Sequence, residues 1–220
     1  MRPHPPVARG FTLIEVLVAM VIMAILAVMA WQGVDGIMRT RTASQARLEQ
    51  LLRVNTVLAQ LEQDLNASQD SGALPQNLPT FDGISLSLTR HTPAGLQLVV
   101  WSLRGGTWLR WAGPSATHAR ALQENWMTSQ QFLGNEPGQL RTLTGLSGWQ
   151  CYCFRGNAWS NCQSSAGTAT VAPPPAVPGS GNAPVAVTLD PLKAVRVVLT
   201  FGEGSGYAGS VTREIALGPQ

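Results

Sequence analysis

The sequence of 220 residues has few charged side chains and gathers them nowhere. Asp, Glu, Lys and Arg make up 12% of the residues, and the formal net charge is +3. Blocks of about five or six like charges, which are typical of tails that bind nucleic acid, do not occur. A basic face or stripe is the usual mark of a nucleic-acid-binding domain. The sparse, mixed charge therefore gives no reason to expect a nucleic-acid partner.

Residues that commonly act in catalysis or ligate metals are also scarce. Of the three histidines, His91 and His118 stand alone, and no motif links either of them to a nucleophile or to further ligands. Asp and Glu do not recur at the spacing of a calcium loop. Ser and Asp are too scattered to propose a triad from the sequence. We therefore expect no enzymatic activity, no bound metal and no cofactor.

The chain has only three cysteines: Cys151, Cys153 and Cys162. A C-x-C pair with one distant cysteine and no nearby histidine is a poor tetrahedral set, which argues against zinc. A two-residue turn at Gly156-Asn157 would place Cys151 opposite Cys162, whereas a four-residue loop, 156–159, would place Cys153 opposite Cys162. In an oxidising compartment we expect one disulfide that includes Cys162 and one spare thiol. The alternative that all three are reduced stays open.

One long stretch has no charge at all. Val16 to Val34 is a predominantly apolar run without a charged residue, and its 19 residues would span about 28 Å as a helix, close to the thickness of a bilayer core. A secretory signal peptide has a shorter apolar core and a small-residue cleavage site, so a membrane anchor fits better. One carboxylate, Glu15, stands at the head of this stretch. A carboxylate in a spanning helix is a candidate functional residue, although a merely interfacial position stays open.

The apolar stretch continues into a proline-free segment of mixed polarity that ends near Asn66. Its apolar residues recur at spacings of three and four, which predicts one stripe along a helix: Leu51, Val54, Leu58, Leu61 and Leu65. Polar residues, Asp64 among them, fill the other faces. We expect one nearly continuous helix over 11–66, with a transmembrane half at about 12–34 and an amphipathic second half. Gly33 and Gly36 are points where it could bend.

The rest of the chain, 67–220, predicts an antiparallel β domain. Short segments of alternating polarity are separated by turn residues, and no alternating β–α–β pattern occurs. We expect a hairpin turn at Gly105-Gly106 and a weakly ordered, Pro/Gly-rich loop at 164–191. The expected fold class is α+β, a long N-terminal helix packed on an antiparallel sheet. The expected strands cover 84–89, 96–103, 108–111, 140–143, 148–154, 194–201 and 210–217, with a short helix within 119–133.

The residues G-F-T-L-I-E, from Gly10 to Glu15, together with the apolar tail that follows them, resemble the cleavage and methylation signal of type IV prepilins and type II secretion pseudopilins. The resemblance implies that 1–10 is a leader, that a prepilin peptidase cuts after Gly10, and that the new N-terminal residue, Phe11, is N-methylated. It also implies that Glu15 fixes the axial register of packed helices. Phe11 and Glu15 share a helical face, so the carboxylate can offset the charge of the freed amine.

Within that group the chain is most similar to J-type minor pseudopilins of type II secretion. The similar stretches are W-Q-G-V-D at 31–35, L-E-Q-D-L at 61–65, the strand at 96–103 and the closing hairpin with T-R-E-I at 212–215. The resemblance implies a single-pass protein of the inner membrane of a Gram-negative bacterium, with its C-terminal domain in the periplasm. It also implies I-type and K-type pseudopilins as partners at the tip of the pseudopilus filament.

Two other functions stay open at this point. The chain could be a minor pilin of a type IV pilus, which primes assembly or aids adhesion or DNA uptake. A membrane-anchored periplasmic enzyme is a more remote alternative, since no residue constellation supports it.

Overall fold

The computed structural model describes residues 10–69, 72–74, 79–164, 190–207 and 209–218. It divides into two compact units, Met1–Leu51 and Leu52–Gln220. The expected loop at 164–191 lies almost entirely outside the described residues. The α+β class that the sequence predicts is confirmed, because a long helix is followed by antiparallel sheets.

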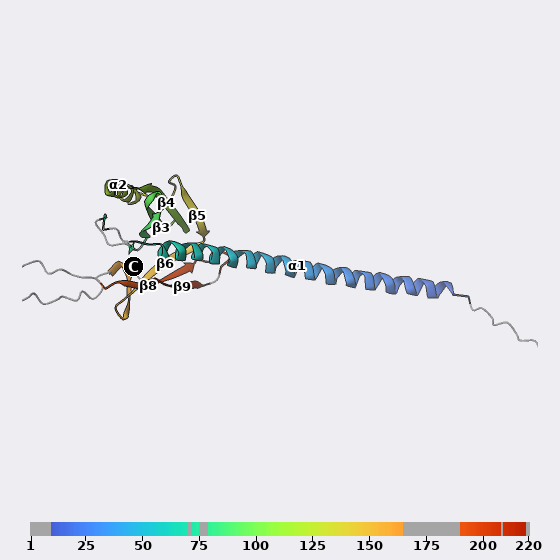
Figure 1. Ribbon diagram of the computed structural model, residues 1–220. Coiled ribbons are helices and arrows are strands. Elements are labelled where there is room, and N and C mark those ends of the chain that lie inside the picture. The colour runs from blue at the N-terminus through green and yellow to red at the C-terminus, as the bar shows by residue number, and fades with distance from the viewer. Residues whose placement is uncertain (1–9, 70–71, 75–78, 165–189, 208, 219–220) are drawn as a thin grey trace, which may run out of the picture. The chain divides into compact units, whose positions relative to one another are not determined.

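A single helix, α1 (Leu13–Asn66), accounts for the first unit and for the start of the second (Figure 1). It has 54 residues and no proline, so no residue lacks the backbone N–H that the helix needs. The predicted long helix is confirmed, although it begins two residues later than Phe11. Neither Gly33 nor Gly36 interrupts it. Every residue from Gly10 to Glu49 is exposed, so the first unit has no buried core of its own.

The second unit contains two antiparallel sheets. The sequence predicted an antiparallel β domain but not its division into two sheets. The first sheet has the strand order β1-β2-β3-β4-β5, and the second has the order β7-β6-β8-β9. The strands of the first are β1 (Thr80–Phe81), β2 (Ser85–Thr92), β3 (Gly95–Arg104), β4 (Thr107–Ala116) and β5 (Gln139–Thr144). Those of the second are β6 (Leu146–Arg155), β7 (Ala158–Asn161), β8 (Leu192–Phe201) and β9 (Ser210–Ala216). A helix, α2 (Ala119–Ser129), joins β4 to β5, and a 3-10 turn, η1 (Cys162–Ser164), follows β7.

One glycine separates the two sheets. Gly145 is the only residue between β5 and β6, and its φ of +79° is in the left-handed region that favours glycine. A Cβ at this position would lie 2.4 Å from Cβ of Ser205, so a larger residue would clash as well as strain the backbone. The chain leaves the first sheet and enters the second at this point.

The predicted hairpin turn at Gly105-Gly106 is also present. Arg104 pairs with Thr107, and the two glycines between them have φ angles of +52° and +70°. Two consecutive positive φ angles are what a two-residue turn of type I′ requires. The turn fixes the pairing of β3 with β4.

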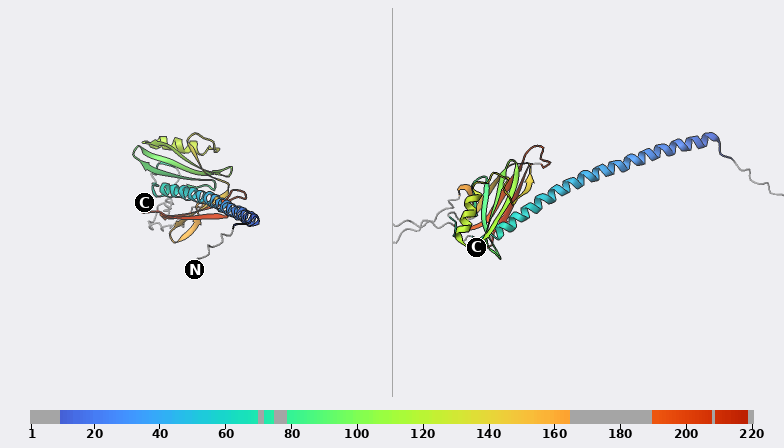
Figure 2. Two further views of the ribbon diagram at one scale, coloured as in Figure 1. Left: turned by 90° about the vertical axis from the view of Figure 1, so that its right-hand side faces the viewer. Right: turned by 90° about the horizontal axis from the view of Figure 1, so that it is seen from above.

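The main core lies where the last turns of α1 meet both sheets (Figure 2, left). Four residues of the predicted stripe are buried: Val54, Leu58, Leu61 and Leu65. The fifth, Leu51, is 53% exposed, so the stripe is shorter than the spacing predicted. Leu52 is also exposed, at 56%, so the first buried residue of α1 is Val54.

Aromatic side chains join the two sheets within this core. The ring centroids of Trp101 and Trp108 are 4.6 Å apart, and those of Trp108 and Trp149 are 5.4 Å apart. Phe81 meets Trp149 edge-on at 4.9 Å. Each such pair contributes about 0.5–1.5 kcal/mol beyond the area it buries. These contacts run from β3 and β4 of the first sheet to β6 of the second.

A smaller core covers the opposite face of the first sheet. Leu98 and Val100 of β3 pack there with Leu122 of α2, while the alternate residues Val99 and Trp101 belong to the main core. Successive side chains of a strand point to opposite faces. The middle of β3 is therefore buried on both sides, between α2 and the end of α1.

The expectation that Asp64 lies on a face away from the apolar stripe is wrong. Its exposure is 0%, because it sits between Leu61 and Leu65 on the buried side of α1. Arg110 binds both carboxylate oxygens, through Nε to Oδ2 at 2.7 Å and through Nη2 to Oδ1 at 2.8 Å. Arg90 donates from Nη1 to Oδ1 at 3.0 Å. Two arginines of the first sheet thus hold one carboxylate of the helix.

Neutral groups complete the shell around this carboxylate. The indole Nε1 of Trp101 donates to Oδ2 of Asp64 at 2.9 Å, and Nε2 of Gln60 donates to Oδ1 at 3.3 Å. The guanidinium of Arg110 also lies over the ring of Trp101, 5.9 Å from its centroid. A buried charge is tolerated only when it is paired and hydrogen-bonded, and Asp64 meets both conditions.

Candidate functional site

The two residues at the predicted cleavage point stand outside the helix. Gly10 and Phe11 precede α1 and have no regular secondary structure, and Phe11 is 88% exposed. A Cβ placed on Gly10 would have no neighbour within 4 Å, and Gly10 has no positive φ. The fold itself therefore gives no reason for glycine at this position. The peptide bond between the two residues is accessible from solvent.

The helix begins with a capping box, in which Thr12 and Glu15 satisfy each other's backbone groups. The Oε2 atom of Glu15 accepts from the backbone N of Thr12 at 2.9 Å and from its Oγ1 at 2.8 Å. The backbone N of Glu15 donates in return to Oγ1 of Thr12 at 3.4 Å. This reciprocal arrangement satisfies backbone N–H groups that a helix start leaves without partners. Removal of residues 1–10 would leave both partners in place.

The capping role of Thr12 was missed by the sequence analysis, which paired Glu15 only with the amine of Phe11. The signal was present, because Ser or Thr followed three residues later by Glu is the pattern of a capping box. The other carboxylate oxygen, Oε1, has no hydrogen-bond partner among the described residues. Glu15 can therefore cap its own helix and still offer an oxygen to another group.

The apolar part of α1 meets the requirements of a membrane span by length and composition. It contains a window with a mean hydropathy of 2.8, and no residue of that window is buried. The exposed side chains include Leu13, Ile14, Leu17 and Met20. Such a surface is unfavourable in water and requires an apolar partner.

In the second unit, the structure joins Cys153 to Cys162 by a disulfide and leaves Cys151 as a buried free thiol. The turn between β6 and β7 is the two-residue turn at Gly156-Asn157, because Arg155 pairs with Ala158. That turn was expected to bring Cys151, not Cys153, opposite Cys162. Cys162 instead bonds to Cys153, the other partner that the sequence left open, because β7 ends at Asn161, one residue before Cys162, which belongs to η1.

We expect the thiol of Cys151 to resist alkylation in the folded protein. Burial raises the pKa of this thiol to about 12, so at neutral pH almost none of it is the reactive thiolate. Incubation with a maleimide, followed by mass spectrometry, should show no adduct on the native chain and one adduct in concentrated urea. The variant Cys151→Ser should show none in either condition. Rapid labelling of the native chain would contradict the prediction.

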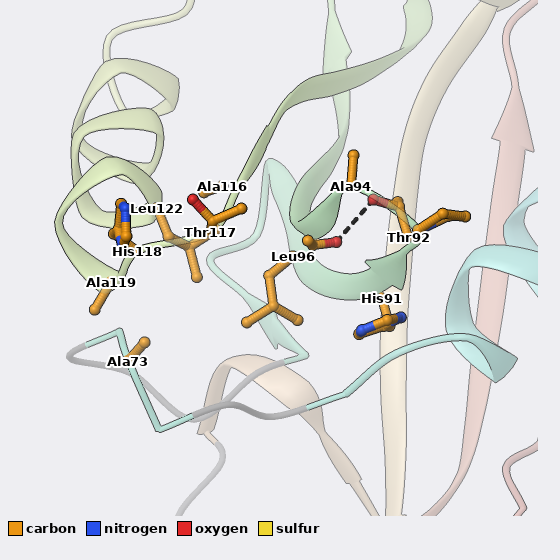
Figure 3. Close-up of a pocket in the computed structure, with 12 residues that line it drawn as sticks. Ala73, His91, Thr92, Ala94, Leu96, Ala116, Thr117, His118, Ala119 and Leu122 are labelled. Atoms are coloured by element: carbon orange, nitrogen blue, oxygen red, sulfur yellow. Dashed lines mark hydrogen bonds between the residues drawn. The ribbon is translucent and has the colours of Figure 1, made fainter.

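The two histidines of the β domain line a hollow of about 630 Å³ between the β2–β3 turn and the start of α2. Figure 3 shows His91 and His118 on opposite sides of it. The hydroxyl of Thr92 is used within the turn, where it donates to the carbonyl of Gly95 at 2.7 Å. The walls are mainly alanine, leucine and backbone. Among the described residues, no hydrogen bond joins the side chain of either histidine to another group of this lining.

The described residues also contain no group of three or more His, Cys, Asp or Glu side chains arranged to hold a metal ion. The candidate site is therefore the segment from Gly10 through the apolar half of α1.

A family model of known proteins matches the chain in a range that overlaps this segment. Residues 6–31 match the family model of the prokaryotic N-terminal methylation motif. The resemblance of the N-terminus to methylated precursors is thereby confirmed. No curated protein sequence matches the chain.

Among solved structures, the chain is similar to one in the crystal structure of the GspK-GspI-GspJ complex from the enterotoxigenic Escherichia coli type 2 secretion system. The identity is 16% and the TM-score is 0.44, over 77% of this chain and 99% of that one.

Proposed function

We propose that this chain, which carries a prokaryotic N-terminal methylation motif, is a minor pseudopilin of a type II secretion system. The observation that carries the proposal is the match over residues 6–31, together with the exposed Gly10–Phe11 bond just ahead of α1, an uninterrupted helix whose first half is apolar. A prepilin peptidase removes the leader, 1–10, and methylates Phe11. The chemistry occurs on this protein, which has no catalytic role of its own.

The apolar half of α1, at about 12–34, anchors the precursor in the inner membrane and later packs among other helices of the filament. Arg2 and Arg9 precede this half, and Arg39 and Arg41 follow it. Because basic residues flank both ends, the positive-inside rule does not decide the orientation. The proposal places the leader in the cytoplasm and residues 67–220 in the periplasm.

Glu15 sets the register of assembly in this proposal. One of its oxygens is used by Thr12 within its own helix, and the other is available to the freed amine of a Phe11, either its own or that of a neighbouring subunit. An ion pair in an apolar bundle adds little net stability, but it discriminates strongly between axial positions. Filament subunits need this discrimination because an apolar helix alone slides easily against another.

The proposed partners are I-type and K-type minor pseudopilins, which would form with this chain a complex at the tip of the pseudopilus and so support export across the outer membrane. The J-type assignment is supported by the sequence stretches at 31–35, 61–65 and 96–103. In the structure the second stretch is the end of α1 that enters the core, and the third lies within β3.

The decisive experiment is reconstitution of the tip complex. The soluble region from about Arg39 onward would be co-expressed with the soluble domains of the I-type and K-type pseudopilins of the same genome, and complex formation would be measured by size exclusion. We expect one ternary complex. If no complex forms although circular dichroism shows each domain folded, the proposal is wrong, and the methylation motif would then favour a minor pilin of a type IV pilus, for which twitching motility is the next assay.

A further inference from the structure

Three buried cysteines share one part of the core, and only two of them are bonded. Cys151 and Cys153 are two residues apart on β6, so both side chains point to its inward face. All three cysteines belong to the main core, with exposures of 0%, 4% and 2% along the chain. A disulfide and a free thiol thus occupy neighbouring positions on one strand.

The pairing of β6 with β7 ends one residue before Cys162. Tyr152 pairs with Asn161, and Cys153 pairs with Ser160. One further step of the same register would set Cys162 opposite Cys151, where paired Cα atoms lie about 4.5–5.5 Å apart. The observed bond instead runs diagonally to Cys153, with the Cα atoms 5.1 Å apart. Both separations suit a disulfide.

The side chain of Asn161 accepts a hydrogen bond at the point where the chain leaves β7. The backbone N of Gln163 donates to Oδ1 of Asn161 at 2.9 Å, which turns the chain out of β7 and into η1. The side chain of Gln163 then donates from Nε2 to the carbonyl of Asp82 at 2.8 Å. These two hydrogen bonds hold Cys162 beside Cys153 and tie the end of β7 to the turn that follows β1.

We propose that Cys162 is a shared bonding partner and that the protein has two disulfide isomers, Cys153–Cys162 and Cys151–Cys162, related by internal thiol–disulfide exchange. The thiolate of Cys151 attacks Sγ of Cys162. The new bond joins Cys151 to Cys162, the bond between Cys162 and Cys153 breaks, and Cys153 leaves as a thiolate that takes up the proton lost by Cys151. No oxidant or reductant is consumed.

The exchange has a structural consequence. In the second isomer Cys162 extends β7, so η1 is lost together with the hydrogen bond from Gln163 to Asp82. Asp82 follows β1 of the first sheet, whereas β7 belongs to the second. The isomer therefore decides whether the end of β7 is hydrogen-bonded to the turn after β1, while Nε1 of Trp149, which donates to the carbonyl of Ile84 at 3.0 Å, joins β6 to that turn in both isomers. Because Cys151 is buried and protonated, exchange proceeds only when the end of β7 opens.

The test uses the full-length chain in membranes, which are dissolved in concentrated urea at mildly acidic pH with excess N-ethylmaleimide, so that the buried free thiol is blocked before the disulfides are mapped. Chymotrypsin cuts after Tyr152 and so separates Cys151 from Cys153. We expect Cys153–Cys162 to predominate in the wild type. The variant Cys153→Ser should form Cys151–Cys162 in place of the missing bridge. Two free thiols in this variant, under conditions in which Cys151→Ser is fully bridged, would overturn the proposal.

A second pair of variants keeps all three cysteines and leaves the core unchanged. Asn161→Val removes the acceptor for the N–H of Gln163 and favours extension of β7, whereas Asn161→Asp keeps an acceptor oxygen. We expect the ratio of Cys151–Cys162 to Cys153–Cys162 to rise about tenfold in Asn161→Val, the effect of losing one net hydrogen bond, and to stay at the wild-type value in Asn161→Asp. Equal ratios in the two variants would also overturn the proposal.

Discussion

Replacing Asp64 by alanine is expected to destabilise the second unit by about 3–5 kcal/mol, the cost of breaking a buried ion pair from one side. The carboxylate has 0% exposure, and its removal would leave two guanidinium groups without their anion. The free-energy cost is largest at Arg110, because this side chain belongs to a residue that is only 8% exposed and would lose two charge-assisted hydrogen bonds. A domain of this size is stable by only about 5–15 kcal/mol, so the variant would be close to unfolding.

The measurement is the free energy of unfolding in urea of the region from about Arg39 onward, with tryptophan fluorescence as the readout. Trp101 reports directly, since its indole donates to Asp64. Glu62→Ala is the matched control, two residues earlier on the same helix. Glu62 binds Nη2 of Arg213 at 2.7 Å, but both side chains are more than a third exposed, so this pair contributes about 0–1 kcal/mol. A loss in Asp64→Ala no larger than in Glu62→Ala would contradict the prediction.

The variant Asp64→Asn tests whether the stability depends on the negative charge of the side chain or only on its shape and hydrogen bonds. Asparagine fills the same space and keeps one acceptor oxygen, but it brings an N–H₂ group toward a guanidinium. We expect a loss smaller than that of alanine yet clearly above that of the Glu62 control. An Asp64→Asn variant as stable as the wild type would show that hydrogen bonding, without the negative charge, suffices to hold Arg90 and Arg110.

The long helix was predictable because its signals are local. A proline-free run with apolar residues three and four apart specifies a helix whatever it packs against. Most strands were also predictable, since alternation and glycine turns act within a few residues. The split into two sheets was not, because it depends on one glycine, Gly145, whose φ of +79° is a tertiary requirement.

The buried Asp64 shows the limit of composition as a guide. A charged residue on a helix usually faces water, but Asp64 stands three residues after Leu61, a spacing that places it on the apolar side. The second signal was Arg110, which occupies an inward position of β4 two residues after Trp108. Each was ambiguous alone. Only the pairing of distant segments brings the two charges together, and no local pattern encodes that pairing.

The cysteines show the same limit at shorter range. The sequence allowed a two-residue turn or a four-residue loop before β7. The structure has the two-residue turn, yet the bond is not the one between Cys151 and Cys162 that this turn implied. The strand ends at Asn161, whose side chain accepts from the backbone N of Gln163, so Cys162 lies beyond the paired residues. A register argument therefore holds only as far as the strand itself extends.

The second large effect is expected at the cleavage point. Gly10→Val should leave the fold unchanged, because a Cβ at Gly10 meets nothing within 4 Å and the residue has no positive φ. Under the proposed function it should nevertheless abolish removal of the leader, since the peptidase, not the fold, requires glycine there. Immunoblots and mass spectrometry of the membrane fraction would show the precursor alone, without methylated Phe11. Normal processing of Gly10→Val would show that the exposed bond is not the peptidase site.

Substitutions of Glu15 distinguish capping from assembly. Glutamine keeps an oxygen that accepts from the backbone N and Oγ1 of Thr12, so Glu15→Gln preserves most of the cap while removing the charge. We expect this variant to be processed normally but to lose secretion in a strain that lacks the wild-type gene, because no anion remains for the amine of Phe11.

Thr12→Val is the complementary control, since it removes the hydroxyl of the cap and keeps the carboxylate. We expect it to retain secretion, because a cap at an exposed helix end contributes modestly and the packed bundle holds the helix in place. If Glu15→Gln secretes normally while Thr12→Val does not, Glu15 serves only its own helix, and the register of the filament must be set by other contacts. The two variants differ in one hydroxyl and one charge, so the comparison assigns the role of Glu15 to one or the other.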